Sequence, residues 1–433
     1  MVRHILISLA TISCTIAVNA VSTDTSTLIM DKDVRSLAIR NPDHFMAPPV
    51  IRLDGNDHVN INFDIIADSH EYLRYKIIHC NADWTPSRLL ESEFLNGFNE
   101  AQVTDYAYSN NTYVHFVNYN ISLPNDDISF LTGGNYLLQV YREDNPDDII
   151  LQARFAVSEN IAKVEGLVSS RTDRGFNSEW QQIDLDVDVS GTPVRNPYQD
   201  LIITVTQNNR PETTRTVTHP LRVENNHAIF SHNQDLVFEA GNEYRRFETV
   251  RADYPGMHTD SVAFGGTNWH AYLTVDYPRA DKNYSYDSTQ HGRFLIREYN
   301  ATDSDLGADY VTVHFSLDAP EIVGADIYVD GDFSQNRFTE ANRMAYDYNS
   351  RLYQAQIPLK QGSYNYQYVA LPKGDGDDEN NTGHISRPKA SNAIIEGNHY
   401  ETDNEYLVKV FCREPAARAD RLIATLILSS SGK

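Results

Sequence analysis

The sequence predicts an all-β protein of about three consecutive β-sandwich domains that follow a signal peptide. The main observation is a hydrophobic pattern with a period of two, which is typical of strands with one buried face. In residues 59–65, VNINFDI, every second side chain is apolar. The second observation is that turn residues separate such segments, as in LDGND, TGGN and KQGS. Many short strands punctuated by turns favour sandwiches over a doubly wound sheet.

Residues 183–190, IDLDVDVS, show the alternation most clearly. Their apolar side chains are expected to face a core, while Asp184, Asp186 and Asp188 lie on a solvated sheet face rather than in a metal site. Polar residues on the outward face also argue against a membrane barrel, whose outer surface is apolar. A short helix is expected within 86–98. Further strands are expected at 112–124, 135–144, 151–157, 201–208, 271–278, 310–317, 325–333, 352–359, 364–371 and 405–414.

The N-terminus is typical of a secretory signal. Arg3 precedes a mostly apolar run, ILISLATISCTIAV, and the small residues of AVNA predict cleavage after Ala20. The run is too short to span a bilayer. After cleavage, Cys80 and Cys412 are the remaining cysteines, which excludes a disulfide scaffold. These two thiols can pair only if the segments that carry them meet, which the sequence does not decide.

The chain is strongly acidic. Its 433 residues include 60 Asp and Glu but 36 Lys and Arg, for a formal net charge of −24. This excess argues against binding to nucleic acid and to anionic lipid surfaces. It fits a soluble exported protein, or one that docks on a basic surface. No segment after the signal approaches the ~18 consecutive apolar residues of a spanning helix, so no membrane insertion is expected.

Two polar breaks without alternation divide the chain, one at VSENIAKVEG (157–166) and one at RADKNYSYDSTQHGR (279–293). Domain boundaries fall in such segments. The expected division is a signal peptide at 1–20 and β-sandwiches at 30–158, 159–282 and 290–430.

The stretch RYKIIHCNADWTPSRL contains the residue types of metal sites and thiol catalysis. His79 and Cys80 close a predicted strand and point to opposite faces, so they cannot both bind one ion without a bend. A zinc site would also need two further ligands at a suitable spacing. The structural interpretation is therefore favoured over a metal or a nucleophile. It makes Cys80 a small buried residue, lets Asp83 cap the turn that begins at Asn81, and packs Trp84 on the sheet.

Other candidate motifs are weak. The acidic segment KGDGDDENN (373–381) lacks the full pattern of a calcium loop, so a solvated loop is favoured and calcium binding stays open. FGGTNWH (264–270) precedes a strand rather than a helix, which excludes a phosphate cradle. Acidic residues are too numerous to single out a glycosidase pair. No cofactor or metal is expected.

Residues 325–370 resemble the immunoglobulin-like modules of glycan-binding and starch-active proteins, with a V-x-G-x-F start and a G-x-Y-x-Y hairpin. Sugar faces usually stack on Trp, yet Trp84, Trp180 and Trp269 all lie outside this segment. The similarity is interpreted as architectural. A periplasmic glycan-binding β-sandwich protein remains the alternative function.

Several longer motifs resemble the plug protein of the type IX secretion system. YKIIHCNADWTPSRL, EFLNGF, SNNTYVHFVNYNISLPN and GGNYLLQVY match its N-terminal domain in order and spacing, and QNNRPE, AGNEYRRFE, LKQGSYNYQYVAL and IIEGNHYETDNEYLVKVFCRE continue the match. The resemblance carries no catalytic residue. The motif positions, interpreted as structural, are His79, Cys80, Asn81, Asp83, Trp84, Gly97, Phe98, Asn242, Glu243 and Arg245.

The resemblance implies a mechanical function in a bacterium of the Bacteroidota. The expected protein is a non-enzymatic plug on the periplasmic side of the outer membrane. Its expected partner is the very large β-barrel translocon, whose periplasmic mouth it seals when no cargo occupies the pore. Exposed Tyr-rich segments at 283–287 and 346–353 are candidate contact surfaces, although ordinary strand packing is the favoured interpretation of their Tyr residues.

Overall fold

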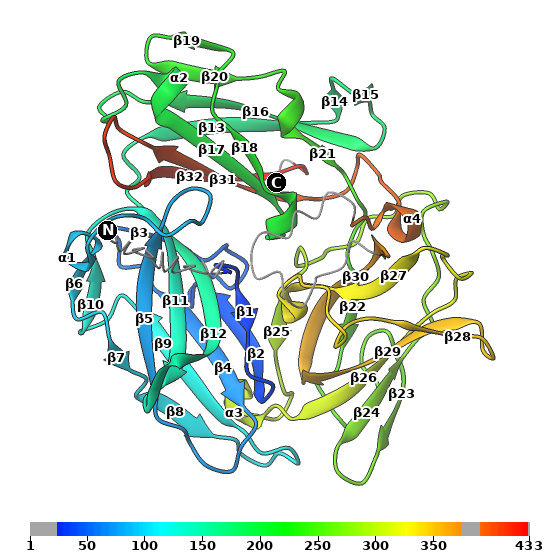
Figure 1. Ribbon diagram of the computed structural model, residues 1–433. Coiled ribbons are helices and arrows are strands. Elements are labelled where there is room, and N and C mark those ends of the chain that lie inside the picture. The colour runs from blue at the N-terminus through cyan, green and yellow to red at the C-terminus, as the bar shows by residue number, and fades with distance from the viewer. Residues whose placement is uncertain (1–23, 374–389, 432–433) are drawn as a thin grey trace, which may run out of the picture.

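The computed structural model describes residues 24–373 and 390–431 (Figure 1). The predicted cleavage after Ala20 and nearly all of the acidic segment 373–381 lie outside the described residues. The prediction of an all-β sandwich fold is confirmed, and some strands have the expected bounds, including β4 (Val59–Ile65) and β26 (Tyr310–Leu317). The short helix expected within 86–98 is α1 (Glu91–Phe94). The other α-helices of the described chain are also one turn long: α2 (Pro197–Asp200), α3 (Ser304–Gly307) and α4 (Ala393–Glu396).

The first unit comprises residues 24–159 and contains two facing sheets, which are antiparallel except for the parallel pairing of β3 with β12. Val59, Ile61 and Phe63 of β4 are fully buried between them, as the alternation in the sequence predicts. One sheet has the order β1-β12-β11-β5-β7 with β3 beside β12, and the other has the order β2-β4-β9-β8. The bounds are β1 (Leu28–Ile29), β2 (Val34–Arg40), β3 (Val50–Arg52), β5 (Leu73–Cys80), β7 (Ala101–Gln102), β8 (Asp105–Tyr108), β9 (Val117–Leu123), β11 (Gly134–Arg142) and β12 (Asn145–Ser158), with a small ladder of β6 (Leu95–Gly97) and β10 (Ile128–Phe130).

The second unit combines residues 160–241 with 402–431. Its sheet β13-β16-β20-β19, with β21 beside β16, faces the sheet β18-β17-β31-β32. The Asp residues of β16 are half-exposed while Leu185 and Val187 are buried, so the predicted solvated face is confirmed. The bounds are β13 (Lys163–Ser169), β16 (Trp180–Asp188), β17 (Leu201–Gln207), β18 (Arg215–Val217), β19 (Arg222–Glu224), β20 (His227–Phe230), β21 (Val237–Glu239), β31 (Glu405–Cys412) and β32 (Arg421–Ser429), with a short hairpin of β14 (Arg171–Thr172) and β15 (Gly175–Phe176).

The third unit comprises residues 242–401. Strand β30 pairs with β22, β25 and β27, and the sheet β23-β24-β26-β29-β28 packs against this group. Phe247, Phe315 and Tyr366 meet edge to face in the core between the two layers. The bounds are β22 (Arg245–Glu248), β23 (Thr259–Phe264), β24 (Trp269–Leu273), β25 (Phe294–Ile296), β27 (Ala325–Asp330), β28 (Ala345–Asp347), β29 (Leu352–Lys360) and β30 (Gly362–Pro372).

The strand pairing differs from the expected division at 159–282 and 290–430. Leu201 of β17 pairs with Cys412 of β31, so the last strands of the chain complete the second sandwich rather than the third. Strands β22 to β24, expected in the second domain, pair with β30 and β26 of the third. Alternation shows which face of a strand is buried, but it does not identify the neighbouring strand. We therefore propose domain boundaries at the three units defined above, with the third inserted into the second.

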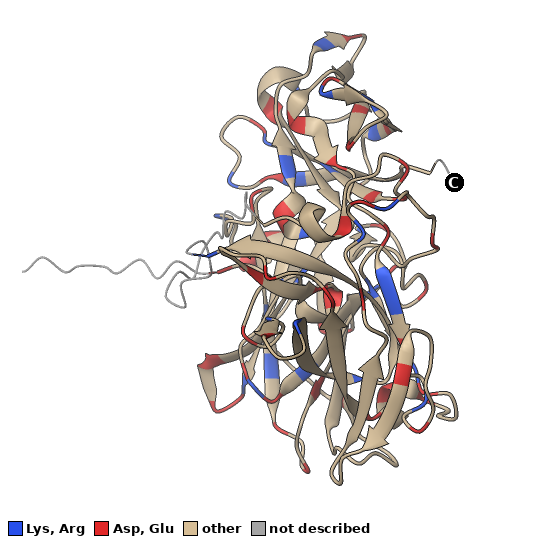
Figure 2. Ribbon diagram, turned by 90° about the vertical axis from the view of Figure 1, so that its right-hand side faces the viewer, with Lys and Arg blue, Asp and Glu red and all other residues tan. Residues whose placement is uncertain are grey.

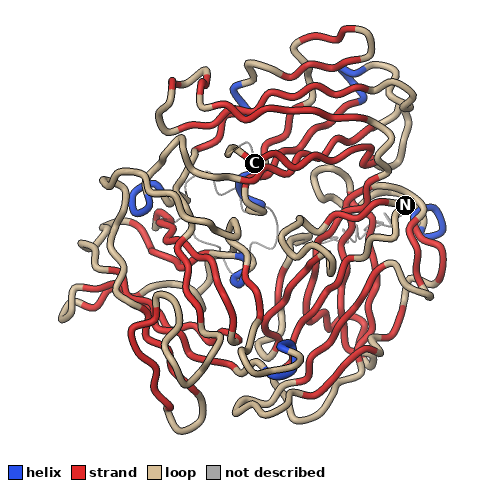
Figure 3. The backbone as a smooth tube through the Cα atoms, turned by 180° about the vertical axis from the view of Figure 1, so that it is seen from behind, coloured by secondary structure: helices blue, strands red, loops and turns tan. Residues whose placement is uncertain are grey.

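The three units surround a common centre, each in contact with the other two (Figures 1 and 3). Strands β1 and β2 of the first unit, β17 and β31 of the second, and β25 of the third are nearest to this centre (Figure 1). Asp and Glu positions are spread over all three units, in agreement with the large negative charge (Figure 2).

Candidate functional site at the junctions of the three sandwiches

The turn after β5 connects the first unit to the second. Asn81 N–H donates to the carbonyl of Thr85 at 2.8 Å, which closes the turn. Next to it, Ala82 N–H donates to Asp420 Oδ2 at 3.0 Å, and Asp420 N–H donates to Asn81 Oδ1 at 3.2 Å. Asp420 is completely buried and pairs with Arg413. The turn therefore holds the loop between β31 and β32, more than 300 residues away in the chain.

His79 and Cys80 are both buried where β5 ends. His79 Nε2 donates to the carbonyl of Gly133 at 3.3 Å, and its ring packs edge to face on Tyr136. Burial lowers the pKa of His79 and raises the pKa of the Cys80 thiol to about 12. The Cys80 thiol is therefore protonated near pH 7, which does not suit an activated thiolate. Cys80 and Cys412 are free thiols.

Asp83 and Trp84 occupy the rest of the turn. Asp83 Oδ1 accepts hydrogen bonds from the amide and hydroxyl of Thr85 at 3.0 and 2.6 Å, so it caps the turn as expected. Trp84 has a left-handed backbone, with φ at 67°. The guanidinium carbon of Arg154 lies 4.2 Å from the centroid of its ring, and the ammonium nitrogen of Lys409 lies 4.8 Å from the same centroid. The sequence predicts packing of Trp84 on the sheet; in the structure its ring lies against Arg154 of β12 and Lys409 of β31, strands from two different units.

Gly97 and Phe98 follow α1 at the end of the first unit. Gly97 has φ at 115°, and an added Cβ would lie 1.9 Å from the carbonyl oxygen of Asp127. Glycine is therefore required there for close backbone approach. Phe98 is 88% exposed, so it is not a core residue.

Asn242, Glu243 and Arg245 lie where the chain passes from the second unit to the third. Asn242 Nδ2 donates to the carbonyl of Glu396 at 2.8 Å. Glu243 Oε1 accepts the amide of Asp403 at 3.0 Å. These contacts tie the segment that enters the third unit to the segment that leaves it.

Arg245 is the centre of a buried charge network within the third unit. Its Nη1 donates to Asp276 Oδ1 at 2.7 Å and its Nε to Glu396 Oε1 at 3.0 Å, and all three side chains are at most 8% exposed. The hydroxyls of Tyr366 and Tyr368 each donate to Asp276 Oδ2 at 2.7 Å. Burial raises the pKa of Asp276, but the hydrogen bonds and cationic neighbours outweigh burial and lower it to about 2.

The first and third units meet at a fully buried ion pair. Lys360 Nζ of β29 donates to Asp64 Oδ2 of β4 at 2.6 Å, and each side chain is 1% exposed. Tyr310 OH and Asn118 Nδ2 also donate to Asp64, at 2.6 and 2.8 Å. Lys360 further lies 4.0 Å from the ring centroid of Phe116. A buried pair needs this degree of hydrogen bonding to offset the loss of water.

Ion pairs also join the remaining two junctions. Arg421 of β32 pairs with Glu159 at 2.6 Å between the second and first units. Arg293 of the third unit pairs with Glu405 of β31 at 2.5 Å, and these two side chains are at most 13% exposed. Charged contacts therefore connect every pair of sandwiches in the described chain.

Three exposed tyrosines surround the half-buried ring of His70 on one part of the surface, here named the aromatic face: Tyr72, Tyr106 and Tyr108. His70 stacks on Tyr106 at 4.5 Å between ring centroids and lies 3.0 Å from the hydroxyl of Tyr108. Strand β8, which carries two of these rings, lies at the same end of the molecule as the β23–β24 hairpin (Figure 1). Just beyond β8, Asn110 N–H donates to the carbonyl of Leu306 at 2.9 Å, so this end of β8 borders the third unit.

The Tyr-rich segments singled out in the sequence are only partly exposed. Tyr284 OH donates to Glu243 Oε1 at 2.6 Å, and Tyr353 is buried at 4% exposure. Tyr348 is 71% exposed. Strand packing therefore accounts for Tyr353 in β29, whereas residues 283–287 form a loop in which Tyr284 is held by its hydrogen bond to Glu243. The aromatic face was not singled out from the sequence.

The described residues contain no cluster of three or more His, Cys, Asp or Glu side chains arranged to hold a metal ion. Within the same ranges, no helix has the length and apolar character needed to cross a bilayer.

These observations define an all-β protein whose packed sheets are joined by buried polar contacts. Residues 34–159 match the family model described as the type 9 secretion system plug protein 1st domain, so this part of the chain belongs to that domain family. The family is a secretion-system plug domain and is not a known enzyme family. Membership associates the chain with type IX secretion.

A solved structure extends the similarity to nearly the whole chain. The crystal structure of a hypothetical protein from Parabacteroides merdae ATCC 43184 shares 36% sequence identity, with a TM-score of 0.88. The similarity covers 93% of this chain and 99% of that chain. A comparison with curated proteins found no match.

Proposed function

We propose that this protein is a non-enzymatic plug that seals the periplasmic mouth of the type IX secretion barrel in the outer membrane when no cargo occupies the pore. The family of the first unit supports the association with secretion. The observation that carries the mechanical part is the set of charged contacts at all three junctions. A plug must resist deformation. Because each sandwich is fixed to two neighbours, no sandwich can hinge independently.

The proposed contact surface is the aromatic face. Tyr combines a large apolar area with a hydroxyl that can bond to a partner, and it is enriched at protein interfaces. Tyr72 is 63% exposed and Tyr108 is 48% exposed. The net charge of −24 keeps the free protein soluble and would steer it towards a basic rim.

The test is purification of the tagged protein from membranes under gentle detergent extraction. Co-purification of a barrel of very high mass supports the proposal. A second measurement is the entry of large antibiotics into cells whose channel carries no cargo. Deletion of the gene should increase entry, and restoring the intact gene should reverse it. Unchanged entry together with no co-purifying barrel would refute the proposed function.

A further inference from the structure

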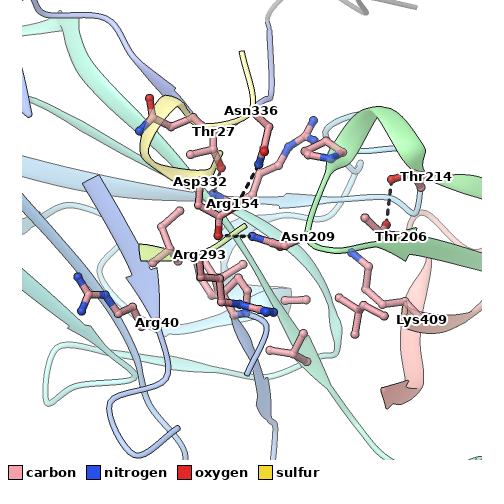
Figure 4. Close-up of a pocket in the computed structure, with 18 of the residues that line it drawn as sticks. Thr27, Arg40, Arg154, Thr206, Asn209, Thr214, Arg293, Asp332, Asn336 and Lys409 are labelled. Atoms are coloured by element: carbon pink, nitrogen blue, oxygen red, sulfur yellow. Dashed lines mark hydrogen bonds between the residues drawn. The ribbon is translucent and has the colours of Figure 1, made fainter. Parts of the chain in front are cut away.

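A cavity of about 430 Å³ lies where the three units meet (Figure 4). The first unit contributes Trp84 and Arg154, the second contributes Thr206 and Lys409, and the third contributes Arg293 and Asp332. This volume falls within the ~300–1,000 Å³ range of sites for small organic ligands. The cavity is thus large enough for a ligand that would touch all three sandwiches.

Two cations in the cavity have no carboxylate partner among the described residues. Arg154 donates to the carbonyl and hydroxyl oxygens of Thr25 at 2.5 and 3.4 Å, through Nε and Nη2. Lys409, which is 8% exposed, donates to Asn135 Oδ1 at 2.8 Å. An ammonium has three donors and a guanidinium has five, so both groups retain N–H donors for a ligand.

Other deeply buried cations of the protein are paired. Lys360 contacts Asp64, Arg293 contacts Glu405, and Arg245 contacts two carboxylates. Acidic residues outnumber basic ones by 60 to 36, so carboxylates are plentiful in this sequence. The missing partners of Arg154 and Lys409 are therefore specific to the cavity.

Arg40 extends the same pattern. It also lines the cavity and forms no ion pair within the described residues, although the nearby Asp305 favours its charged form; its guanidinium carbon lies 5.8 Å from the ring centroid of Phe294. Figure 4 shows it at the end of the cavity opposite Lys409. Burial lowers the pKa of all three cations. The pKa of Arg40 falls below its usual value, that of Arg154 falls to about 10, and that of Lys409 falls to about 7. The nearby Arg154 charge lowers the pKa of Lys409 further. A bound anion would relieve the repulsion between the charges of Arg154 and Lys409.

We propose that the cavity binds a small organic anion, whose carboxylate or phosphate lies at Arg154 and Lys409 and whose apolar body lies along the aromatic and aliphatic part of the lining. Trp84 supplies a ring next to both cations, and Leu407 and Phe294 supply further apolar surface. Because the lining comes from all three units, the bound anion would also stabilise their arrangement. The inference is independent of the proposed role in secretion.

The test uses Trp84 as the reporter. In the mature chain with Trp180→Phe and Trp269→Phe, Trp84 is the remaining tryptophan. Its emission is followed during titration with benzoate, phenyl phosphate and neutral benzamide at constant ionic strength. We expect a saturable change with one or both anions and none with benzamide. The tighter of the two anions identifies carboxylate or phosphate as the preferred group.

Lys409→Met should weaken anion binding about tenfold or more, because it removes a charged donor. The matched control is Lys163→Met, which removes an exposed lysine of β13 and should leave binding unchanged. Absence of a saturable response, an equal response to benzamide, or unchanged affinity in a folded Lys409→Met variant would overturn the proposal. If that variant does not fold, calorimetric titration of the unaltered chain decides. Saturable heat at one site supports the proposal, and its absence refutes it.

Discussion

Replacing Lys360 with Met should strongly destabilise the protein, because it leaves Asp64 buried at the junction of the first and third units. The ammonium makes hydrogen bonds of 2.6 Å to Asp64 Oδ2 and to the carbonyl of Asp305. Breaking a buried pair by removing one partner costs about 3–5 kcal/mol. Burial raises the pKa of Asp64, and Lys360 opposes that shift. Without Lys360, Asp64 can take up a proton, so a loss near the lower limit, about 3 kcal/mol, is expected.

The assay is urea unfolding at pH 7 followed by circular dichroism, with the free energy of unfolding extrapolated to water. The matched control is the double variant Lys360→Met/Asp64→Asn. It removes both charges but retains an amide that can bond to Tyr310 and Asn118. Because neutral replacement of a buried pair is often tolerated, the double variant should recover at least half of the lost stability.

A loss below about 1 kcal/mol in Lys360→Met would contradict the reasoning, since that is the range of exposed pairs. The same conclusion would follow if the double variant were no more stable than the single one. Either result would mean that this junction does not depend on its buried charges.

Three further predictions concern other parts of the structure. Cys80→Ser should cost about 1 kcal/mol in urea unfolding and leave antibiotic entry unchanged, because the thiol is neutral and buried; loss of sealing in a folded variant would contradict this. The pKa of Asp276 is about 2 when folded and 3.8 when exposed, so its contribution, about 2 kcal/mol, is complete above pH 3.8 and lost as the pH falls through 2. Acid should therefore destabilise the unaltered chain more than Asp276→Asn in the same urea assay, and parallel acid profiles would refute this. Tyr108→Ser should reduce co-purification of the barrel, whereas Tyr348→Ser, an exposed control outside the aromatic face, should not; equal yields would exclude the aromatic face as the contact surface.

Much of the fold can be predicted from the sequence, since alternation depends only on neighbouring residues. Residues 59–65 and 310–317 form strands with the expected bounds. Which strands pair with one another is harder to predict from the sequence. The alternation within β31 predicts that it is a strand, but its pairing with β17 joins residues about 200 positions apart. Nothing in the local pattern of either strand encodes that partnership.

The candidate site is also only partly predictable from the sequence. His79 and Cys80 are recognisable as the end of a strand because they follow an alternating segment. Asp64 lies on the face of β4 opposite the apolar residues, where alternation alone predicts contact with water. In the structure the third unit covers that face, and Lys360 becomes its partner. The signal for such a pair lies in tertiary contacts that one sequence does not display.

The insertion of the third unit into the second has a consequence for biogenesis. β31 lies between β17 and β32, so the second sandwich cannot be completed until the last strand of the chain has emerged. During synthesis from the N-terminus, β17 would keep an unpaired edge while the ~160 residues of the third unit are made. A chain truncated before residue 405 would keep that edge permanently open and would be prone to aggregation. Completion of the second sandwich thus depends on strands that are made about 200 residues after β17.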